Sequence, residues 1–222
     1  ADKEGVVQRL GSLDEVNWWE DDILVLGRNS FVFRDLERDL RSDGVIFETR
    51  GHNSVKRSTL ESVKIWEKLR SGGEVASDDV RSVYGLMSSG PSVKRGYKTL
   101  PGVPADQMLS LEWLIANGGL LRSEIWHEAL DRIPKDEATY MLRSLQKGEK
   151  MSGRPRVRLS TIHGSKGGEA EHVVIIRDMA ARTFHEARVE PEDEARVWYV
   201  ASTRAKTKLS IIAPTSRMSY DF

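Results

Sequence analysis

Two polar stretches near the carboxyl end of the chain carry residue types that could bind phosphate. The first, STIHGSKGGEAEH (160–172), offers the hydroxyls of Thr161 and Ser165 and the charge of Lys166 between two apolar, β-branched runs. Hydroxyl and lysine side chains bond phosphate oxygens, and ligands of open parallel sheets bind at the carboxyl ends of strands. This stretch therefore predicts a phosphate-binding loop, although a solvated turn has the same composition.

The second stretch, EDEARVWYVASTRAKTKLSII (192–212), predicts a helix followed by a strand. Glu194, Val197, Ala201 and Arg204 follow one another at three- and four-residue steps, so they can share one helix face. An arginine that reaches a transferring phosphoryl group is a known catalytic device. The alternative is a surface arginine that only favours the helix dipole.

The elements that must position these stretches alternate between strand and helix at both ends of the chain, which predicts an α/β fold with one parallel sheet. Residues 73–150 show helical periodicity only and predict an all-helical insertion between a first part (1–72) and a second part (151–222). Apolar runs predict the strands, and spacings of three and four predict the helices. The expected strands are 22–28, 45–49, 157–162, 172–177 and 208–213; the expected flanking helices are 2–16, 30–42 and 191–206.

Several kinds of chemistry are excluded by the sequence. Gly-Lys occurs nowhere, so the chain has no P-loop of the G-x-x-x-x-G-K-[ST] type, and the absence of cysteine excludes thiolate metal sites. Lys plus Arg equals Asp plus Glu, 34 each, so net charge neither requires nor excludes a nucleic-acid partner. No apolar run approaches ~20 residues. We expect no membrane span, a reducing, cytoplasmic compartment, and no complete reaction by this chain alone.

The two phosphate-binding candidates together form a more specific pattern. The run T-x-H-x-x-K-G-x-E, followed by E-x-x-x-x-Y-V-A-x-T-R-A, resembles motifs V and VI of the UvrD/Rep/PcrA class of superfamily 1 DNA helicases. Residues 22–51 are similar to the stretch that precedes these motifs in that class. The residues that match the two motifs are Thr161, His163, Lys166, Gly167, Glu169, Glu194, Tyr199, Val200, Ala201, Thr203, Arg204 and Ala205.

The resemblance implies a second RecA-like motor domain that works with an N-terminal P-loop domain of the same protein. That partner would hold the Mg²⁺ ligands, and ATP with Mg²⁺ would lie between the two domains. The implied substrate is single-stranded DNA or a single/double-strand junction, with 3′ to 5′ movement and a role such as DNA repair. The alternatives are a non-catalytic DNA- or protein-binding module and the helicase part of a recombination helicase–nuclease.

The resemblance also implies residue roles. Arg204 would touch the ATP γ-phosphate, Glu169 would bond the ribose, and Gly167 would belong to the same nucleotide site. Contacts with DNA would come from Thr161, His163, Lys166, Arg28 and Ser30. The chain departs from the class pattern at Ser30, Gly168, Ala170 and Ala195, which replace a common asparagine, leucine, phenylalanine and arginine.

Overall fold

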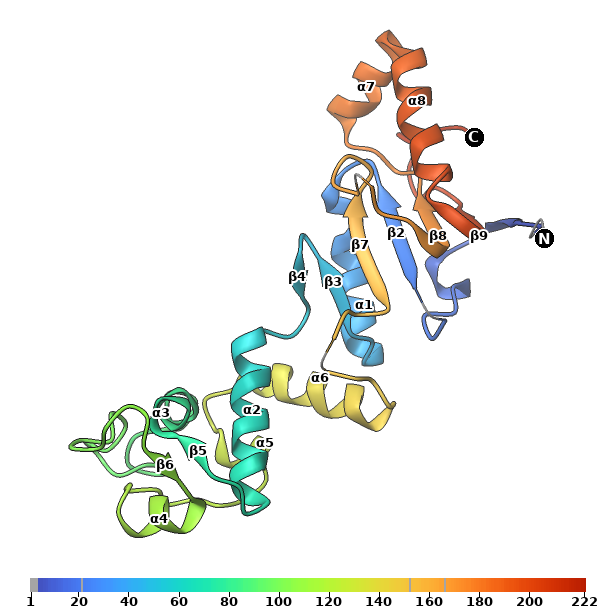
Figure 1. Cartoon of the computed structure of the whole chain (residues 1–222). Coiled ribbons are helices and arrows are strands. Elements are labelled where there is room, and N and C mark those ends of the chain that lie inside the picture. The colour runs from blue at the N-terminus through green and yellow to red at the C-terminus, as the bar shows by residue number, and fades with distance from the viewer. Residues whose placement is uncertain (1–3, 21, 152, 166) are drawn as a thin grey trace. The chain divides into compact units, whose positions relative to one another are not determined.

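The computed structural model describes residues 4–20, 22–151, 153–165 and 167–222. By their internal contacts these residues form two compact units (Figure 1). Unit 1 combines residues 1–54 with 143–222, and unit 2 comprises residues 55–142. The predicted insertion, 73–150, is not identical with unit 2, because unit 2 also includes the helix before residue 73.

Unit 1 is built on a seven-stranded sheet in the order β1-β9-β8-β2-β7-β3-β4. Neighbouring strands pair in parallel except β3 and β4, which form an antiparallel hairpin. Helices cover both faces, and the predicted α/β, RecA-like class is confirmed. The strands are β1 (Val6–Leu10), β2 (Ile23–Gly27), β3 (Phe47–Thr49), β4 (His52–Asn53), β7 (Val157–Thr161), β8 (Ala170–Ile176) and β9 (Ala205–Ile212).

The central strand β2 shows why the sequence folds this way, since all five of its residues are buried. Its side chains alternate between two cores, because successive residues of a strand point to opposite faces. Ile23 and Val25 pack with α1, whereas Leu24 and Leu26 pack with α8. The helices of unit 1 are η1 (Leu13–Glu15), η2 (Ser30–Phe33), α1 (Arg34–Asp43), α7 (Ala181–Val189) and α8 (Pro191–Ser202), together with the end of α6 (Lys135–Gln146).

The amino-terminal helix expected over residues 2–16 is wrong. The described part of this segment forms β1, which pairs in parallel with β9 at the edge of the sheet, and then the short helix η1. The spacing of Val6, Val7, Leu10 and Leu13 is compatible with a helix. A local pattern contains no information about β9, whose free edge pairs with this segment. Val6 and Val7 remain exposed, so backbone pairing rather than burial of these side chains holds the strand.

A buried polar network joins the strands at the β1 edge of this sheet. The ring of His172 is 2% exposed, with Nδ1 2.8 Å from Glu20 Oε2 and Nε2 2.8 Å from Ser210 Oγ. Lys208 Nζ donates to Glu20 at 3.0 Å, and Gln8 Nε2 donates to Ser210 Oγ at 2.8 Å. Burial and the nearby charge of Lys208 lower the pKa of His172 from its ordinary 6.5.

Unit 2 is mainly helical but not all-helical, which corrects one part of the expectation for the insertion. Two short strands, β5 (Val75–Ala76) and β6 (Met108–Leu109), pair antiparallel. The two-residue strands are too short to show a period of two in the sequence. The helices are α2 (Arg57–Arg70), α3 (Ser77–Gly85), α4 (Leu111–Ala116), α5 (Trp126–Ala129) and the start of α6. None of the helices within the described ranges has the length and apolar character to cross a bilayer.

Candidate functional site

The loop after β7 is held by its own hydrogen bonds. The Oγ1 of Thr161 accepts from the amide of Gly164 at 3.1 Å, and Ser165 donates its hydroxyl to the carbonyl of Ile162 at 2.8 Å. The Ser165 amide donates to the Thr161 carbonyl at 2.9 Å. Gly167 has a φ of +78°, a region that side chains other than glycine rarely adopt. The segment 162–169 is named the β7–β8 loop here, and its described residues, 162–165 and 167–169, therefore form a turn held by internal hydrogen bonds.

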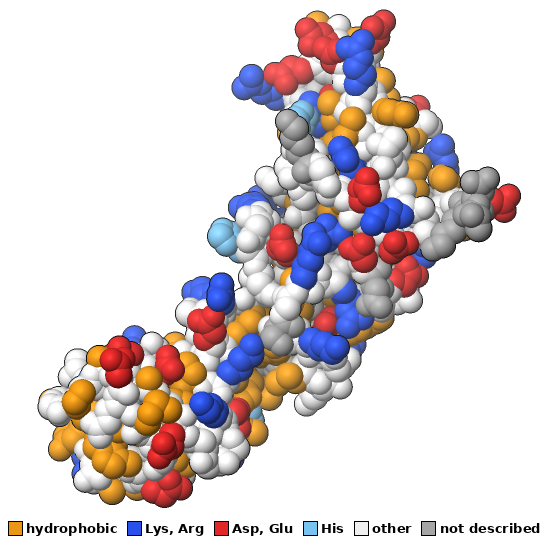
Figure 2. All heavy atoms as spheres, in the orientation of Figure 1, with side chains coloured by type: hydrophobic (Ala, Val, Ile, Leu, Met, Phe, Trp, Pro, Cys, Tyr) orange, Lys and Arg blue, Asp and Glu red, His pale blue; other side chains and the backbone are white. Residues whose placement is uncertain are grey.

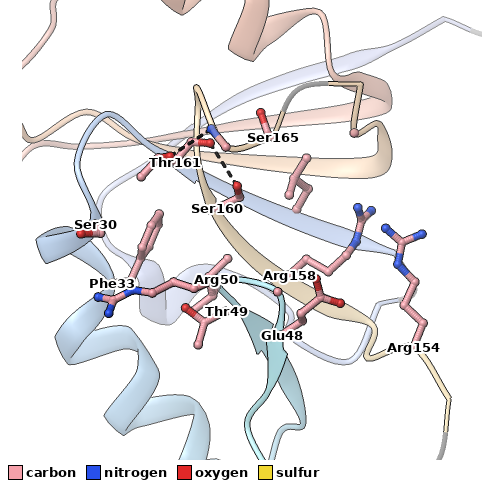
Figure 3. A pocket seen from close by; sticks show the side chains of 15 residues that line it. Ser30, Phe33, Glu48, Thr49, Arg50, Arg154, Arg158, Ser160, Thr161 and Ser165 are labelled. Carbon is pink, nitrogen blue, oxygen red and sulfur yellow. Dashed lines mark hydrogen bonds between the residues drawn. The ribbon is translucent and has the colours of Figure 1, made fainter.

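On one side of this loop lies a pocket of about 430 Å³ (Figure 3). Its lining comes from the start of η2, the β3–β4 hairpin, and β7 with the turn that follows. Beside one acid, Glu48, the polar lining includes the hydroxyl groups of Ser30, Thr49, Ser160, Thr161 and Ser165. Donors of this kind, with cationic side chains beside them, suit the oxygens of a phosphate backbone.

Three arginines line the same pocket but differ in how far their charges are neutralised. Arg158 is buried, with Nη2 2.5 Å from Asp22 Oδ1 and 3.0 Å from the carbonyl oxygen of Glu169. In contrast, Arg50 and Arg154 have no carboxylate partner within 4.0 Å in the part of the chain that the structure describes. Figure 2 shows Lys and Arg side chains interspersed with Asp and Glu side chains on this face of unit 1.

On the α8 side of the loop, Arg28 is held by a buried carboxylate. Its Nε donates to Glu194 Oε1 at 2.9 Å and its Nη2 donates to Oε2 at 3.0 Å, while the indole of Trp198 donates to Oε1 at 2.7 Å. Glu194 is 5% exposed, and these donors satisfy its negative charge. The Nη1 of Arg28 lies 3.3 Å from Nδ1 of His163.

Arg204 lies just past the carboxyl end of α8. With Ile162, His163, Val197 and Val200 it lines a second pocket, of about 340 Å³. The Nε of Arg204 is buried and has no hydrogen-bond partner within the ranges that the structure describes. The Nε of Arg158 is unpartnered in the same way, so an unpaired buried donor, which costs free energy, does not by itself single out Arg204.

The structure thus sorts the predicted site residues into two groups. Ser30 and Thr161 line the hydroxyl-rich pocket. Arg28, His163 and Arg204 lie on the α8 side. His163 lines the pocket of Arg204 and also a third pocket, of about 550 Å³, which Arg28 and Glu194 line. Glu169 is exposed and directly precedes β8, and the amide of the next residue, Ala170, donates to the Arg204 carbonyl at 3.0 Å. Gly167 shapes the loop, and the predicted Lys166 lies outside the described residues.

Sequence reasoning missed one member of these groups and one contact between two others. Arg50 stands at the tip of the β3–β4 hairpin with a φ of +52°, before Gly51, and the Arg-Gly pair after a strand was the available signal. Glu194 is a motif match on the predicted helix face of Arg204, but its ion pair with Arg28 is not predicted, because 166 positions separate the two residues. Its step of four residues to Trp198 indicates only that one helix can carry both groups on its buried face.

Residues 127–216 match the family model of the UvrD-like helicase C-terminal domain. The match spans the β7–β8 loop, α8 and Arg204, and it confirms the resemblance to UvrD-like helicases over this part of the chain. Residues 1–126, with Arg28 and Ser30, lie outside it. No curated protein matches the chain. Across the described residues, no group of three His, Asp or Glu side chains is placed to hold a metal ion.

Proposed function

We propose that this chain is the second RecA-like motor domain of an ATP-dependent DNA helicase or translocase, moving 3′ to 5′, and that Arg204 meets the γ-phosphate of ATP. The observation that carries this proposal is the position of Arg204 just past the end of α8, in a pocket that it shares with Ile162 and His163 of the β7–β8 loop. The family match to a helicase C-terminal domain supports the motor role. The P-loop and the Mg²⁺ ligands would come from an N-terminal domain of the same protein.

The residues around Arg204 suit a nucleotide. A guanidinium stabilises the charge that develops on a transferring phosphoryl group, and it does so most strongly where water is excluded. The exposed carboxylate of Glu169 can accept hydrogen bonds from the hydroxyls of a ribose. Arg28 has its Nε and Nη2 committed to Glu194. We therefore propose that Arg28 acts on the α8 side through its contact with His163, rather than in the pocket that Ser30 lines.

The hydroxyl-rich pocket is the proposed site for single-stranded DNA or a single/double-strand junction. Ser30 and Thr161 would donate to phosphate oxygens, and Arg50 and Arg154 would supply charge without having to leave an acid partner. Contacts of this kind do not read bases, so binding should be weakly sequence-specific and should weaken as salt rises.

The β7–β8 loop supports a coupling between the two activities. Thr161, at its start, lines the DNA pocket, while His163, two residues later, lies beside both arginines. A shift of this short, internally bonded turn moves both groups together. DNA binding would thereby change the position of the Arg204 side chain relative to the γ-phosphate of ATP. The isolated chain should show no DNA-stimulated ATPase, because its sequence has no P-loop.

The test is the single-stranded-DNA-stimulated ATPase of the full-length protein that contains this chain, with Arg204→Ala compared with the unmodified protein. We expect kcat to fall about 10³-fold or more, with DNA affinity unchanged. Arg182→Ala is the matched control, since Arg182 is an exposed arginine of α7 that pairs with Glu186, at 2.8 Å. An unchanged kcat for Arg204→Ala would refute its role. Absence of ATPase from the unmodified protein, with DNA binding intact, would favour a non-catalytic module.

A further inference from the structure

Unit 2 carries a basic loop that the motor proposal does not use. Residues 80–105 contain no Asp or Glu, whereas Lys94, Arg95 and Lys98 fall within five residues of one another around Tyr97. Lys94, Arg95 and Tyr97 are exposed and Lys98 is half-buried. Across the described residues none of these three cations has a carboxylate within 4.0 Å. Residues 94–98 are named the basic loop here.

Buried residues on either side fix the basic loop in place. Val93 and Leu100 are fully buried, so the chain enters and leaves the core of unit 2 at both ends of the loop. The Lys94 amide donates to the carbonyl of Gly119 at 2.8 Å, and the Leu121 amide donates to the carbonyl of Ser92 at 2.9 Å. The loop therefore lies alongside the segment 119–121. It does not gain its shape from the cationic side chains, which stay available to a partner.

Two further sets of hydrogen bonds hold the flanks of the loop. Asp131 accepts from the amide of Ser88 at 2.6 Å and from the hydroxyl of Ser92 at 2.8 Å. On the other flank, Arg81 donates to the carbonyl oxygens of Thr99 at 2.8 Å and Val103 at 2.7 Å. The surface is thus pre-organised, and a ligand would not have to spend binding free energy on ordering it.

Tyr97 gives this loop a feature that an ordinary basic surface lacks. Its ring lies against Gly119, since a Cβ placed on that glycine would be 2.5 Å from Cγ of the tyrosine. Tyr97 as a whole residue is 37% exposed, and it lies between Arg95 and Lys98 in the sequence. A partly exposed aromatic ring among cations can stack on an unpaired base while the cations contact the phosphates around it.

We infer that the basic loop is a binding site for single-stranded nucleic acid, with Tyr97 as the stacking platform and Lys94, Arg95 and Lys98 as phosphate contacts. The three cations supply a salt-sensitive, sequence-independent attraction, and the ring supplies a contribution that does not depend on salt. This site lies wholly within unit 2 and shares no residue with the pocket of unit 1. It therefore stands whether or not the motor proposal does.

The experiment measures fluorescence anisotropy of labelled oligothymidylate, about 20 nucleotides long, against the 222-residue chain over a series of salt concentrations. We expect the triple variant Lys94→Ala/Arg95→Ala/Lys98→Ala to lower affinity and to reduce the slope of log K against log salt by about 2. We expect Tyr97→Ala to lower affinity about 5-fold or more at an unchanged slope. Tyr97→Phe keeps the ring and should bind like the unmodified chain.

A second triple variant, Lys64→Ala/Lys68→Ala/Lys135→Ala, is the matched control because it removes three exposed cations of unit 2 outside the loop. Urea unfolding confirms that each variant is folded. The inference would be overturned if the loop variant had the same salt slope of log K as the unmodified chain. It would also be overturned if the control variant lost as much affinity as the loop variant. A third contradicting result would be a duplex of the same length that binds more tightly than the single strand and with an affinity that Tyr97→Ala does not change. That result would indicate a surface for duplex DNA. Thr161→Val alters the pocket of unit 1, so the effects of the loop variants should be the same with and without it if the two sites are separate.

Discussion

The guanidinium of Arg28 and the carboxylate of Glu194 form a bidentate ion pair, although the two residues are 166 positions apart in the sequence. The pair fastens the carboxyl end of β2 to the first turn of α8, and Trp198 secures the carboxylate from the next turn. Because Glu194 is buried, removing its charge would leave Arg28 without a full counter-charge in a partly dehydrated place.

Replacement of this carboxylate should therefore destabilise unit 1. We expect Glu194→Gln to lower the free energy of unfolding by about 1–3 kcal/mol, because an amide offers Arg28 one neutral acceptor in place of two charged ones. Urea unfolding followed by circular dichroism measures the change. Glu192→Gln is the control: Glu192 is an exposed acid of the same helix turn, 3.8 Å from Arg196, and its loss should stay within about 0.5 kcal/mol. Equal effects of the two variants would show that the pair contributes nothing.

Thr161 offers a direct test of the pocket beside the β7–β8 loop. We expect Thr161→Val to weaken binding of single-stranded DNA about 3- to 30-fold, because valine keeps the shape of the side chain but removes the hydroxyl. The hydroxyl also accepts from the Gly164 amide, so the loop loses one internal bond. Thr207→Val removes a hydroxyl of β9 that lies outside the pocket and should bind DNA normally. DNA affinity that is insensitive to Thr161→Val would contradict the proposed role of the pocket.

The buried ring of His172 predicts a pH dependence of stability. Burial and Lys208 lower its pKa from 6.5, so the unfolded chain takes up a proton near that pH while the folded chain does not. Stability is therefore full above about pH 6.5 and falls as the pH drops below it, by at most about 1.4 kcal/mol per pH unit.

Glu20, the partner of His172, does not interfere with this measurement. Burial opposes a low pKa for this carboxyl group, but Lys208 and His172 together lower it from 4.5. Its contribution to stability is nearly complete about one pH unit above that value, so it changes little between about pH 5.5 and pH 6.5. In this range His172→Gln, which does not titrate, should flatten the dependence of unfolding free energy on pH. A slope that His172→Gln leaves unchanged would assign the effect to other groups.

Alanine substitutions at two glycines of unit 2 can distinguish the cost of backbone strain from the cost of steric overlap. Gly119 and Gly102 have φ values of +69° and +77°. A Cβ would meet the Tyr97 ring at Gly119 but has nothing within 4 Å at Gly102. We expect Gly102→Ala to cost about 1–2 kcal/mol from strain alone. Gly119→Ala should cost more and should also shift the near-ultraviolet circular dichroism of the tyrosine. Equal costs with unchanged spectra would show that the ring does not rest on Gly119.

The elements that could be predicted from sequence are those whose burial leaves a strong local pattern. Residues 22–28 form a near-continuous apolar run, and the structure buries all of β2 between two layers. The helix predicted over residues 2–16 is wrong, because their apolar spacing fits a helix as well as a strand. The pairing of residues 6–10 as a strand depends on β9. Likewise, β5 and β6 are too short to leave a periodic signal.

The chemical groups of the site can be read from the sequence: a turn with hydroxyl groups and a histidine, an arginine after a helix, and no P-loop. Their grouping in space follows from the packing of the elements. Thr161 ends a strand and His163 lies in the turn that follows, so the turn separates two neighbours into different pockets. The same folding brings Arg28 to Glu194 from 166 residues away. Spacing along a chain fixes the relation of residues within one element, whereas packing of several elements fixes which of their side chains meet.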